Sequence, residues 1–220
     1  MPALENSLCI TLSQYGEHIR FQQGEVLWKQ DDQADFVLVV SSGILKFQRQ
    51  WPGGSQTILG LANRDSIIGE ETLNQTPRIS TCTALVSGKA YRVPHKEITT
   101  LLSQKEIALS LLKLSANRLQ QTLTRMEELF DGPVEARLAS TLLRIGSQIG
   151  ISDGKGLFIP VRLTRGELAE FIGCRAETTT RLMTKWKKSG LVDTKREGIV
   201  IQKIDKLQHI AQSSSLPSSQ

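Results

Sequence analysis

Residues 163–186, LTRGELAEFIGCRAETTTRLMTKW, decide how the C-terminal part of this chain folds. Thr164 and Glu167 form the T-x-x-E pattern of a helix capping box, in which each side chain binds the backbone N–H of the other residue. Leu163 and Leu168 occupy the positions of the hydrophobic staple that accompanies such a box. The pattern predicts a helix that begins directly after the capping threonine.

A glycine separates this helix from a second one. Gly173 can adopt the left-handed backbone conformation that ends a helix, and a new helical pattern starts near residue 175. Two helices joined by so short a turn are typical of a helix–turn–helix.

The second helix has two different faces. Side chains spaced at i, i+3, i+4 and i+7 predict a buried stripe: Thr179, Leu182, Met183 and Trp186. The opposite face carries Glu177, Thr180, Arg181 and Thr184, with Thr178 and Lys185 at its margins. In a recognition helix, the N-terminal residues of such a face meet base edges in the major groove of DNA.

The side chains on the outer face suit base recognition. An arginine such as Arg181 can donate two hydrogen bonds to guanine, and a carboxylate such as Glu177 can accept one from cytosine. Threonine is a mediocre helix former, but its short side chain does not block entry into the groove. The alternative is a surface ion pair between Glu177 and Arg181, which contributes only a few tenths of a kcal/mol.

Positive charge is concentrated in the same module. The net charge is +5: residues 162–220 hold 11 Lys or Arg and 6 Asp or Glu, whereas residues 1–161 hold 16 of each. Residues 191–202, LVDTKREGIVIQ, predict a hairpin with Lys195 and Arg196 at its tip, as in a wing that approaches phosphates. A polyanion is the indicated partner. A basic surface kept for solubility, or a winged helix that binds protein, are the alternatives.

Residues 18–93 have the pattern of an antiparallel β-roll. The segments FVLVV, GILKFQR, QTILGLA, STCTALV and KAYRV are rich in branched and apolar residues. Turn signals separate them, among them Ser41–Gly43, Pro52–Gly54 and Ser87–Gly88. Many short strands at this spacing favour an antiparallel barrel or roll, so we expect an α+β protein.

From about residue 95 to 130 the pattern is helical. Apolar residues alternate at spacings of three and four, the period of a coiled coil, at Leu109, Leu112, Ala116, Leu119, Leu123, Met126 and Phe130. This seam predicts a homodimer, because a second copy is the simplest partner. A helix packed on its own sheet would also be apolar. Residues 131–133, Asp-Gly-Pro, should end the helix and act as a hinge before a helix over about 134–149.

Several classes of protein are disfavoured. The chain has no run of about 18 apolar residues and no signal-peptide pattern, so we expect a cytoplasmic protein. Cys9, Cys82 and Cys174 are widely spaced and match neither a disulfide framework nor a metal site. No motif of a hydrolase, metalloprotease or nucleotide-binding enzyme is present, so we expect no enzymatic activity.

These features together resemble the CRP/FNR family of bacterial transcription regulators. The resemblance covers nearly the whole chain: an N-terminal β-roll sensor (jelly-roll type, residues 1–105), a dimerisation helix (106–130), the hinge (131–133), a winged helix–turn–helix (134–210) and a disordered tail (211–220). It implies a homodimer that binds palindromic DNA and works with RNA polymerase.

The resemblance also implies how DNA is read. In this family the glutamate and arginine of the recognition helix read the half-site, and those roles map to Glu177 and Arg181. Ala176 stands where the catabolite-activator branch has an arginine, so we expect a TTGA-like half-site rather than GTGA. Arg175 is either an extra contact or a poor helix cap. The full set of expected DNA contacts is Thr164, Arg165, Arg175, Glu177, Thr178, Thr180, Arg181, Lys185 and Lys195.

Residues 68–81, IGEETLNQTPRIST, resemble a cyclic-nucleotide phosphate-binding cassette. The resemblance implies an effector pocket built from Gly69, Glu70, Arg78, Ile79, Thr122 and Leu123, with the arginine on a cyclic phosphate. The cassette is shorter than usual, and Glu71 replaces an apolar residue. The alternative is that Glu70 and Arg78 pair structurally and the pocket binds something else or nothing, so the effector stays open.

Other sensor chemistries of the family find little support. Iron–sulfur members use a cluster of N-terminal cysteines, and only Cys9 lies there. No cysteine and histidine pair matches the haem ligands of the carbon-monoxide sensors. Cys82 is expected to be a small buried residue.

Overall fold

The computed structural model describes residues 2–152, 154 and 156–212. The chain divides into two compact units, residues 1–121 and 122–220. A single long helix, α4 (Lys105–Asp131), runs through the boundary between them. Within the described residues, no helix is both long and apolar enough to span a membrane.

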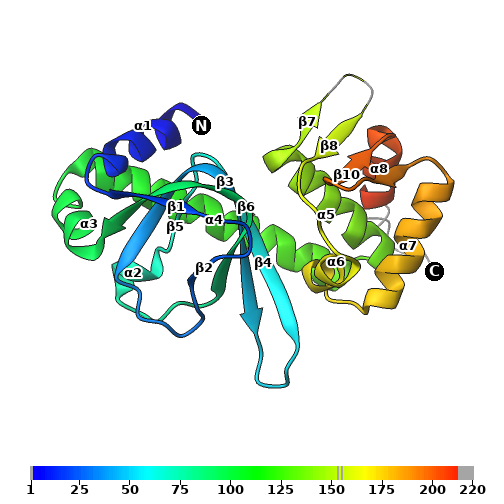
Figure 1. The fold of residues 1–220 in the computed structure, drawn as a ribbon, viewed down its shortest axis with the longest axis horizontal. Helices are drawn as coiled ribbons and strands as arrows, with labels where there is room; N and C mark the ends of the chain where they lie inside the picture. Colours follow the sequence, from blue (N-terminus) through cyan, green and yellow to red (C-terminus); the bar gives the residue numbers. More distant parts are fainter. Residues whose placement is uncertain (1, 153, 155, 213–220) are drawn as a thin grey trace. The chain divides into compact units, whose positions relative to one another are not determined.

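The first unit is built on one antiparallel sheet of six strands (Figure 1). The strands are β1 (Glu17–Phe21), β2 (Val26–Trp28), β3 (Phe36–Gln50), β4 (Gln56–Ala62), β5 (Ile67–Ile68) and β6 (Thr81–Pro94). Their order is β1-β6-β3-β4, with β2 also paired to β6 and β5 to β3. The expected antiparallel β domain is confirmed.

Two of the expected turns are wrong. Ser41–Gly43 and Ser87–Gly88 lie inside the long strands β3 and β6, at irregular points of their pairing. Gly43 has a φ of +90°, and a Cβ on it would lie 2.9 Å from the Cα of Gly88. The two glycines therefore let both strands bend together where they would otherwise have to end.

The start of β3 is buried on both faces, which explains why FVLVV is apolar without alternation. Val37 and Val39 join a cluster with residues of the covering helices, including Leu8, Leu12, Ile98, Leu101 and Ile107. Phe36, Leu38 and Val40 join the cluster on the other face, with Phe21, Trp28 and Cys82. The expectation that Cys82 is buried is confirmed, and burial raises the pKa of its thiol.

The helices of this unit differ from the expected single segment. α3 (His95–Leu101) ends before α4 begins, where one helix from about residue 95 was expected. Two further helices, α1 (Pro2–Ser13) and α2 (Glu71–Asn74), were not expected. α2 has only four residues, too few to show a helical period in the sequence.

Among the residues that the structure describes, the second unit holds the end of α4, four further helices and a small sheet. Its elements after α4 are α5 (Val134–Ile149), β7 (Ile151–Ser152), β8 (Leu157–Ile159), α6 (Arg165–Ile172), α7 (Ala176–Lys188), β9 (Val192–Thr194), β10 (Ile199–Ile201) and α8 (Ile204–Gln212). The strands form an antiparallel sheet in the order β7-β8-β10-β9. The helix over 134–149, the helix–turn–helix and the hairpin of residues 191–202 are confirmed.

The C-terminus differs from expectation. α8 was not expected, and it packs on α5 through the fully buried Leu207. Residues 211 and 212 were placed in a disordered tail but belong to this helix. The rest of the proposed tail, residues 213–220, lies outside the described residues.

Candidate nucleic-acid interface

The start of α6 is fixed by the expected capping box. The Thr164 side chain accepts a hydrogen bond from Glu167 N (3.1 Å), and the Glu167 carboxylate accepts one from Thr164 N (2.9 Å). Gly173 ends the helix with a φ of +62° and a ψ of +50°. The local chemistry thus sets both the start of α6 and the turn that leads into α7.

The buried face of α7 packs this helix against the rest of the second unit. Thr179, Leu182, Met183 and Trp186 are buried, as the spacing predicted. Thr179 is the buried threonine, and its hydroxyl donates to the carbonyl oxygen of Arg165 at 2.8 Å. This bond joins the two helices of the motif, so Thr179 positions α7 against α6.

The outer face of α7 is open. Glu177, Thr180, Arg181 and Thr184 are all exposed. Thr180 and Thr184 donate their hydroxyl protons to the carbonyl oxygens four residues earlier, at 2.8 and 2.7 Å. Each hydroxyl retains only acceptor capacity, so these side chains present a methyl group and an acceptor oxygen.

The residue that begins α7 is not a side-chain cap. Arg175 occupies the N-cap position with extended backbone dihedrals, and its side chain makes no capping hydrogen bond. Its side chain is exposed at the end of the helix where Glu177 also lies. The prediction that Arg175 is a poor helix cap is confirmed. Its exposed side chain is also compatible with a contact to DNA.

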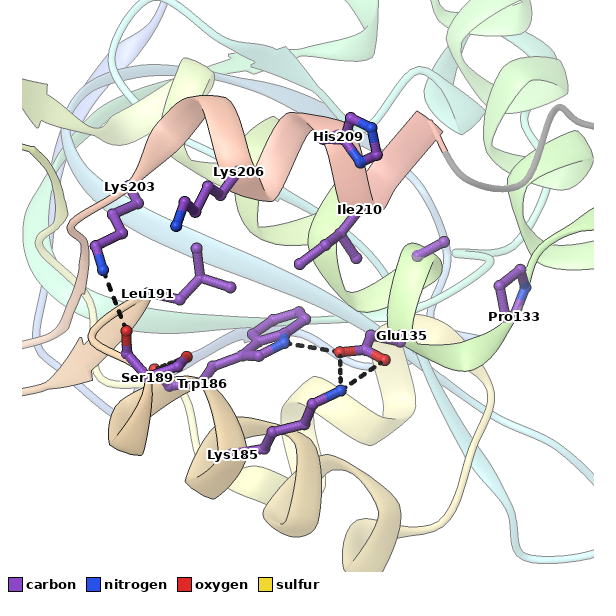
Figure 2. A pocket seen from close by; sticks show the side chains of 11 residues that line it. Pro133, Glu135, Lys185, Trp186, Ser189, Leu191, Lys203, Lys206, His209 and Ile210 are labelled. Carbon is purple, nitrogen blue, oxygen red and sulfur yellow. Dashed lines mark hydrogen bonds and ion pairs between the residues drawn. The ribbon is translucent and has the colours of Figure 1, made fainter.

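Two of the cationic side chains expected to contact DNA have partners within the protein. Lys185 Nζ lies 3.0 Å from Glu135 Oε1, and Trp186 Nε1 donates to the same oxygen at 3.0 Å (Figure 2). Arg165 is half-buried and donates from Nη2 to Thr194 Oγ1 at 3.0 Å. Burial lowers the pKa of the Arg165 guanidinium. Thr178 is also only partly exposed.

Glu135 is ionised more readily than an ordinary glutamate. Burial is the largest single influence on it and raises its pKa. Hydrogen bonds from Lys185 and Trp186, with the charge of Lys185, outweigh that effect, so the pKa of Glu135 lies below its usual value. The anionic form is therefore the one that holds α7 to the start of α5.

The hairpin between β9 and β10 is the expected wing. Its exposed tip is Lys195 to Glu197, closed by a hydrogen bond from Lys195 N to Gly198 O at 2.8 Å. At the base of the wing, Asp193 pairs with Lys187 of α7 at 3.2 Å, and that hydrogen bond lowers the pKa of Asp193. The wing and the recognition helix are thus tied together by an ion pair.

Of the expected effector residues, Gly69 and Arg78 contact each other in the interior of the first unit. The Arg78 side chain is 0% exposed and lies over the rings of Trp28 and Phe36. It donates to Gly69 O at 3.1 Å and to Phe36 O at 2.6 Å, and it pairs with Glu71 at 3.5 Å. Burial lowers the pKa of Arg78, against the charges of Glu71 and Asp35.

The alternative in which Glu70 pairs structurally with Arg78 is wrong. Glu70 pairs with Arg118 of α4, which also donates to the carbonyl oxygen of Ile67. Arg78 takes Glu71 as its carboxylate instead. Glu70 and Glu71 are adjacent, and each forms an ion pair with a different arginine. The second arginine comes from α4, and the apolar spacing in the sequence of α4 did not predict this contact.

Gly69 is required beside the buried arginine. It has a φ of +93°, and a Cβ there would lie 2.5 Å from Arg78 Nη1. Ile79 is 50% exposed, so it does not line the buried site. Thr122 and Leu123 are exposed residues of α4 in the second unit.

Two family models match the chain in the order of its two units. The cyclic nucleotide-binding domain matches residues 18–105, and the Crp-like helix-turn-helix domain matches residues 136–210. The chain belongs to the CRP/FNR family of transcription regulators. The resemblance inferred from the sequence is confirmed, and DNA is a partner of this protein.

Two curated relatives align with more than nine-tenths of this chain. A CRP-like cAMP-activated global transcriptional regulator of Mycobacterium tuberculosis is 23% identical over 206 residues, which are 93% of this chain and 92% of that protein. A global nitrogen regulator of Synechococcus elongatus is 26% identical over 211 residues, 91% of this chain and 95% of that protein. Both relatives are named as global regulators, and the first as a transcriptional one.

Solved structures of the family share the fold. A CRP/FNR family transcriptional regulator from Thermus thermophilus is matched with a TM-score of 0.74 at 22% identity, over 90% of this chain and 100% of that one. FixK2 from Bradyrhizobium japonicum is matched with a TM-score of 0.77 at 16% identity, over 89% and 96% of the two chains.

Sequence reasoning missed three contributors to these sites. Lys188 is exposed in the last turn of α7 and lines a shallow depression with Arg181 and Thr184; its position seven residues after Arg181 could have indicated it. Arg118 and Glu135 pair with residues 48 and 50 positions away. No local pattern in the sequence could have predicted those two contacts.

Proposed function

We propose that this CRP/FNR regulator is a homodimer that reads a palindromic site through the outer face of α7. The observation that carries the proposal is the exposure of Glu177, Thr180 and Arg181 together, opposite a fully buried stripe. Arg181 would donate to guanine and Glu177 would accept from cytosine, in a TTGA-like half-site. Two such helices enter successive major grooves about 34 Å apart.

The other cations would serve phosphate contacts. Arg175, Lys188 and Lys195 are exposed, and charge near phosphates raises affinity for every DNA sequence. Lys185 and Arg165 have partners within the protein, so we assign them to positioning rather than to base readout. Thr164, which caps α6, is assigned to positioning as well, and Thr178 stays a predicted DNA contact. RNA polymerase is the proposed protein partner on DNA.

Replacing Arg181 tests the base-reading role. We expect Arg181→Ala to weaken binding to the palindromic site by about 1–3 kcal/mol, with little change on a scrambled site. Lys188→Ala is the control, because loss of a phosphate contact should weaken both sites alike. Fluorescence anisotropy on both DNAs measures the difference. If Arg181→Ala keeps full discrimination, the assignment of the outer face is wrong.

Salt dependence separates DNA binding from protein binding by the winged helix. Counterion release predicts a steep fall in DNA affinity between about 50 and 200 mM salt. An affinity that is flat over this range would favour a protein ligand for α7 and the wing.

We propose that the roll does not hold a cyclic nucleotide through Arg78. The buried contacts of Arg78 with Glu71 and two carbonyl oxygens support this, because a cyclic phosphate would have to displace them. A ligand at 100 times its Kd adds about 2.7 kcal/mol to stability. We expect no rise in Tm with millimolar cyclic AMP or cyclic GMP. A rise of several degrees with either would restore the cyclic-nucleotide-responsive alternative.

A further inference from the structure

A groove in the second unit lies outside the outer face of α7 and outside the wing. It is bounded by the start of α5, the end of α7 and the helix α8, and it encloses about 560 Å³ (Figure 2). We propose that this groove is a docking surface for an acidic peptide segment of another protein that carries apolar side chains.

The charge of the groove is the first argument. Lys185, Lys203 and Lys206 line it together with His209, and Glu135 is the one carboxylate among the described residues of the lining. That carboxylate is already satisfied, since it accepts hydrogen bonds from Lys185 and Trp186. Lys203 donates only to the neutral carbonyl oxygen of Ser189 at 3.2 Å. The cationic charge of Lys203 and Lys206 therefore has no acidic partner among the residues that line the groove.

The apolar side chains of the groove are the second argument. Pro133 lies at one end, Leu191 lies between Lys203 and Trp186, and Ile210 of α8 lies above the indole of Trp186 (Figure 2). Apolar surface framed by cations complements a peptide in which acidic and apolar side chains alternate. A phosphate backbone gains nothing from such an apolar centre, which favours peptide over DNA.

The groove and the base-reading residues occupy different ends of α7. Trp186 follows Glu177 by nine residues, which is about 13 Å along a helix. The residues that follow α8, SSSLPSSQ (213–220), contain no acidic side chain, so they do not complement the lysines. A segment of another protein is thus the occupant that fits the charge.

The test is a titration of the full-length protein with a labelled synthetic peptide, DDLDDFDLDD. We expect saturable binding that weakens with added salt, and no binding of the neutral peptide NNLNNFNLNN. Lys206→Glu should weaken binding of the acidic peptide by about 10-fold or more, since it reverses a positive charge that has no acidic partner among the described residues lining the groove. Lys96→Glu makes the same change of net charge on exposed α3 and should leave the affinity within about twofold.

Three results would overturn the proposal. If Lys206→Glu and Lys96→Glu weaken peptide binding equally, the binding depends only on the net charge of the protein and not on the groove. Competition between the peptide and the palindromic DNA, with Lys206→Glu weakening both, would assign the groove to DNA. Peptide binding that strengthens when residues 213–220 are removed would make the chain's own tail the occupant. None of these depends on Arg181, so base reading by α7 is tested separately.

Discussion

Single side chains set the geometry of the DNA-binding unit. Glu135 holds both Lys185 and Trp186 at 3.0 Å, so one carboxylate at the start of α5 fixes the end of the recognition helix. Thr179 does the same at the other end through its bond to Arg165 O. In the first unit, Glu71 pairs with the fully buried Arg78 at 3.5 Å.

Removing the Glu135 carboxylate should destabilise the protein. Glu135→Ala leaves the buried Trp186 Nε1 without a partner, and an unsatisfied buried donor costs about 1–3 kcal/mol. Urea denaturation measures the free energy of unfolding. Glu197→Ala, an exposed change on the wing, is the control and should stay within about 0.5 kcal/mol of the parent. Equal stability of the two variants would contradict the anchoring role.

The same carboxylate should make stability depend on pH. The folded-state pKa of Glu135 is lowered, so its contribution is complete above the unfolded-state pKa of about 4.3. The contribution is lost as the pH falls from there through the lower folded-state pKa. The stability gap between the parent and Glu135→Gln should therefore narrow between neutral pH and about pH 3. If the stability difference between the two proteins is constant over this pH range, it arises from packing alone.

Elements are positioned by their ends and by their faces. α6 has a complete capping box, whereas α7 begins at Arg175 without a side-chain cap. α7 is kept in place by its buried face and by the ion pair of Lys187 with Asp193 of the wing. The N-cap position of α7 can hold an arginine because its side chain makes no capping hydrogen bond, and in the proposed complex this arginine would contact a phosphate.

Arg175→Ser should separate capping from contact. A serine at the N-cap accepts a backbone N–H, so we expect the unfolding free energy to rise by about 1 kcal/mol. The lost cation should weaken cognate and scrambled DNA equally and reduce the salt slope by about one. Anisotropy titrations at several salt concentrations measure this. An unchanged slope would leave Arg175 as a poor cap without a role in binding.

At the scale of the whole molecule, α4 carries an apolar seam that one copy leaves uncovered. Leu112, Leu119 and Phe130 are 65%, 62% and 85% exposed, and they repeat with the other seam residues at heptad spacing. The alternative, a helix buried on its own sheet, accounts for Ile107 and Leu111 but not for this stripe. We therefore expect a second copy to cover the seam, with residues 131–133 as the hinge.

Leu119→Glu should break the homodimer. A charge would face its own copy across the seam, and each copy would also lose the burial of a leucine, about 1.5–3 kcal/mol. Light scattering after size exclusion should report a monomer, and affinity for the palindromic site should fall to that of a half-site. Gln121→Glu, exposed on α4 outside the seam, should remain a dimer. A dimeric Leu119→Glu would show that another surface joins the copies.

The sequence by itself determined the features that depend on neighbours within one or two helical turns. The capping box of Thr164, the glycine turn at Gly173 and the two faces of α7 follow from spacings of three and four residues. These were predicted correctly, because backbone hydrogen bonds and apolar periodicity act locally. The wing and the antiparallel strands were predicted for the same reason.

Only the tertiary structure decided which distant charges meet and where long strands bend. The Glu135–Trp186 and Glu70–Arg118 contacts join residues about fifty positions apart, and nothing in either segment selects the partner. Gly43 and Gly88 were predicted to lie in turns, but each lies inside a long strand, where the two strands approach each other closely. Burial, including that of Arg78, depends on what the rest of the fold places around a side chain.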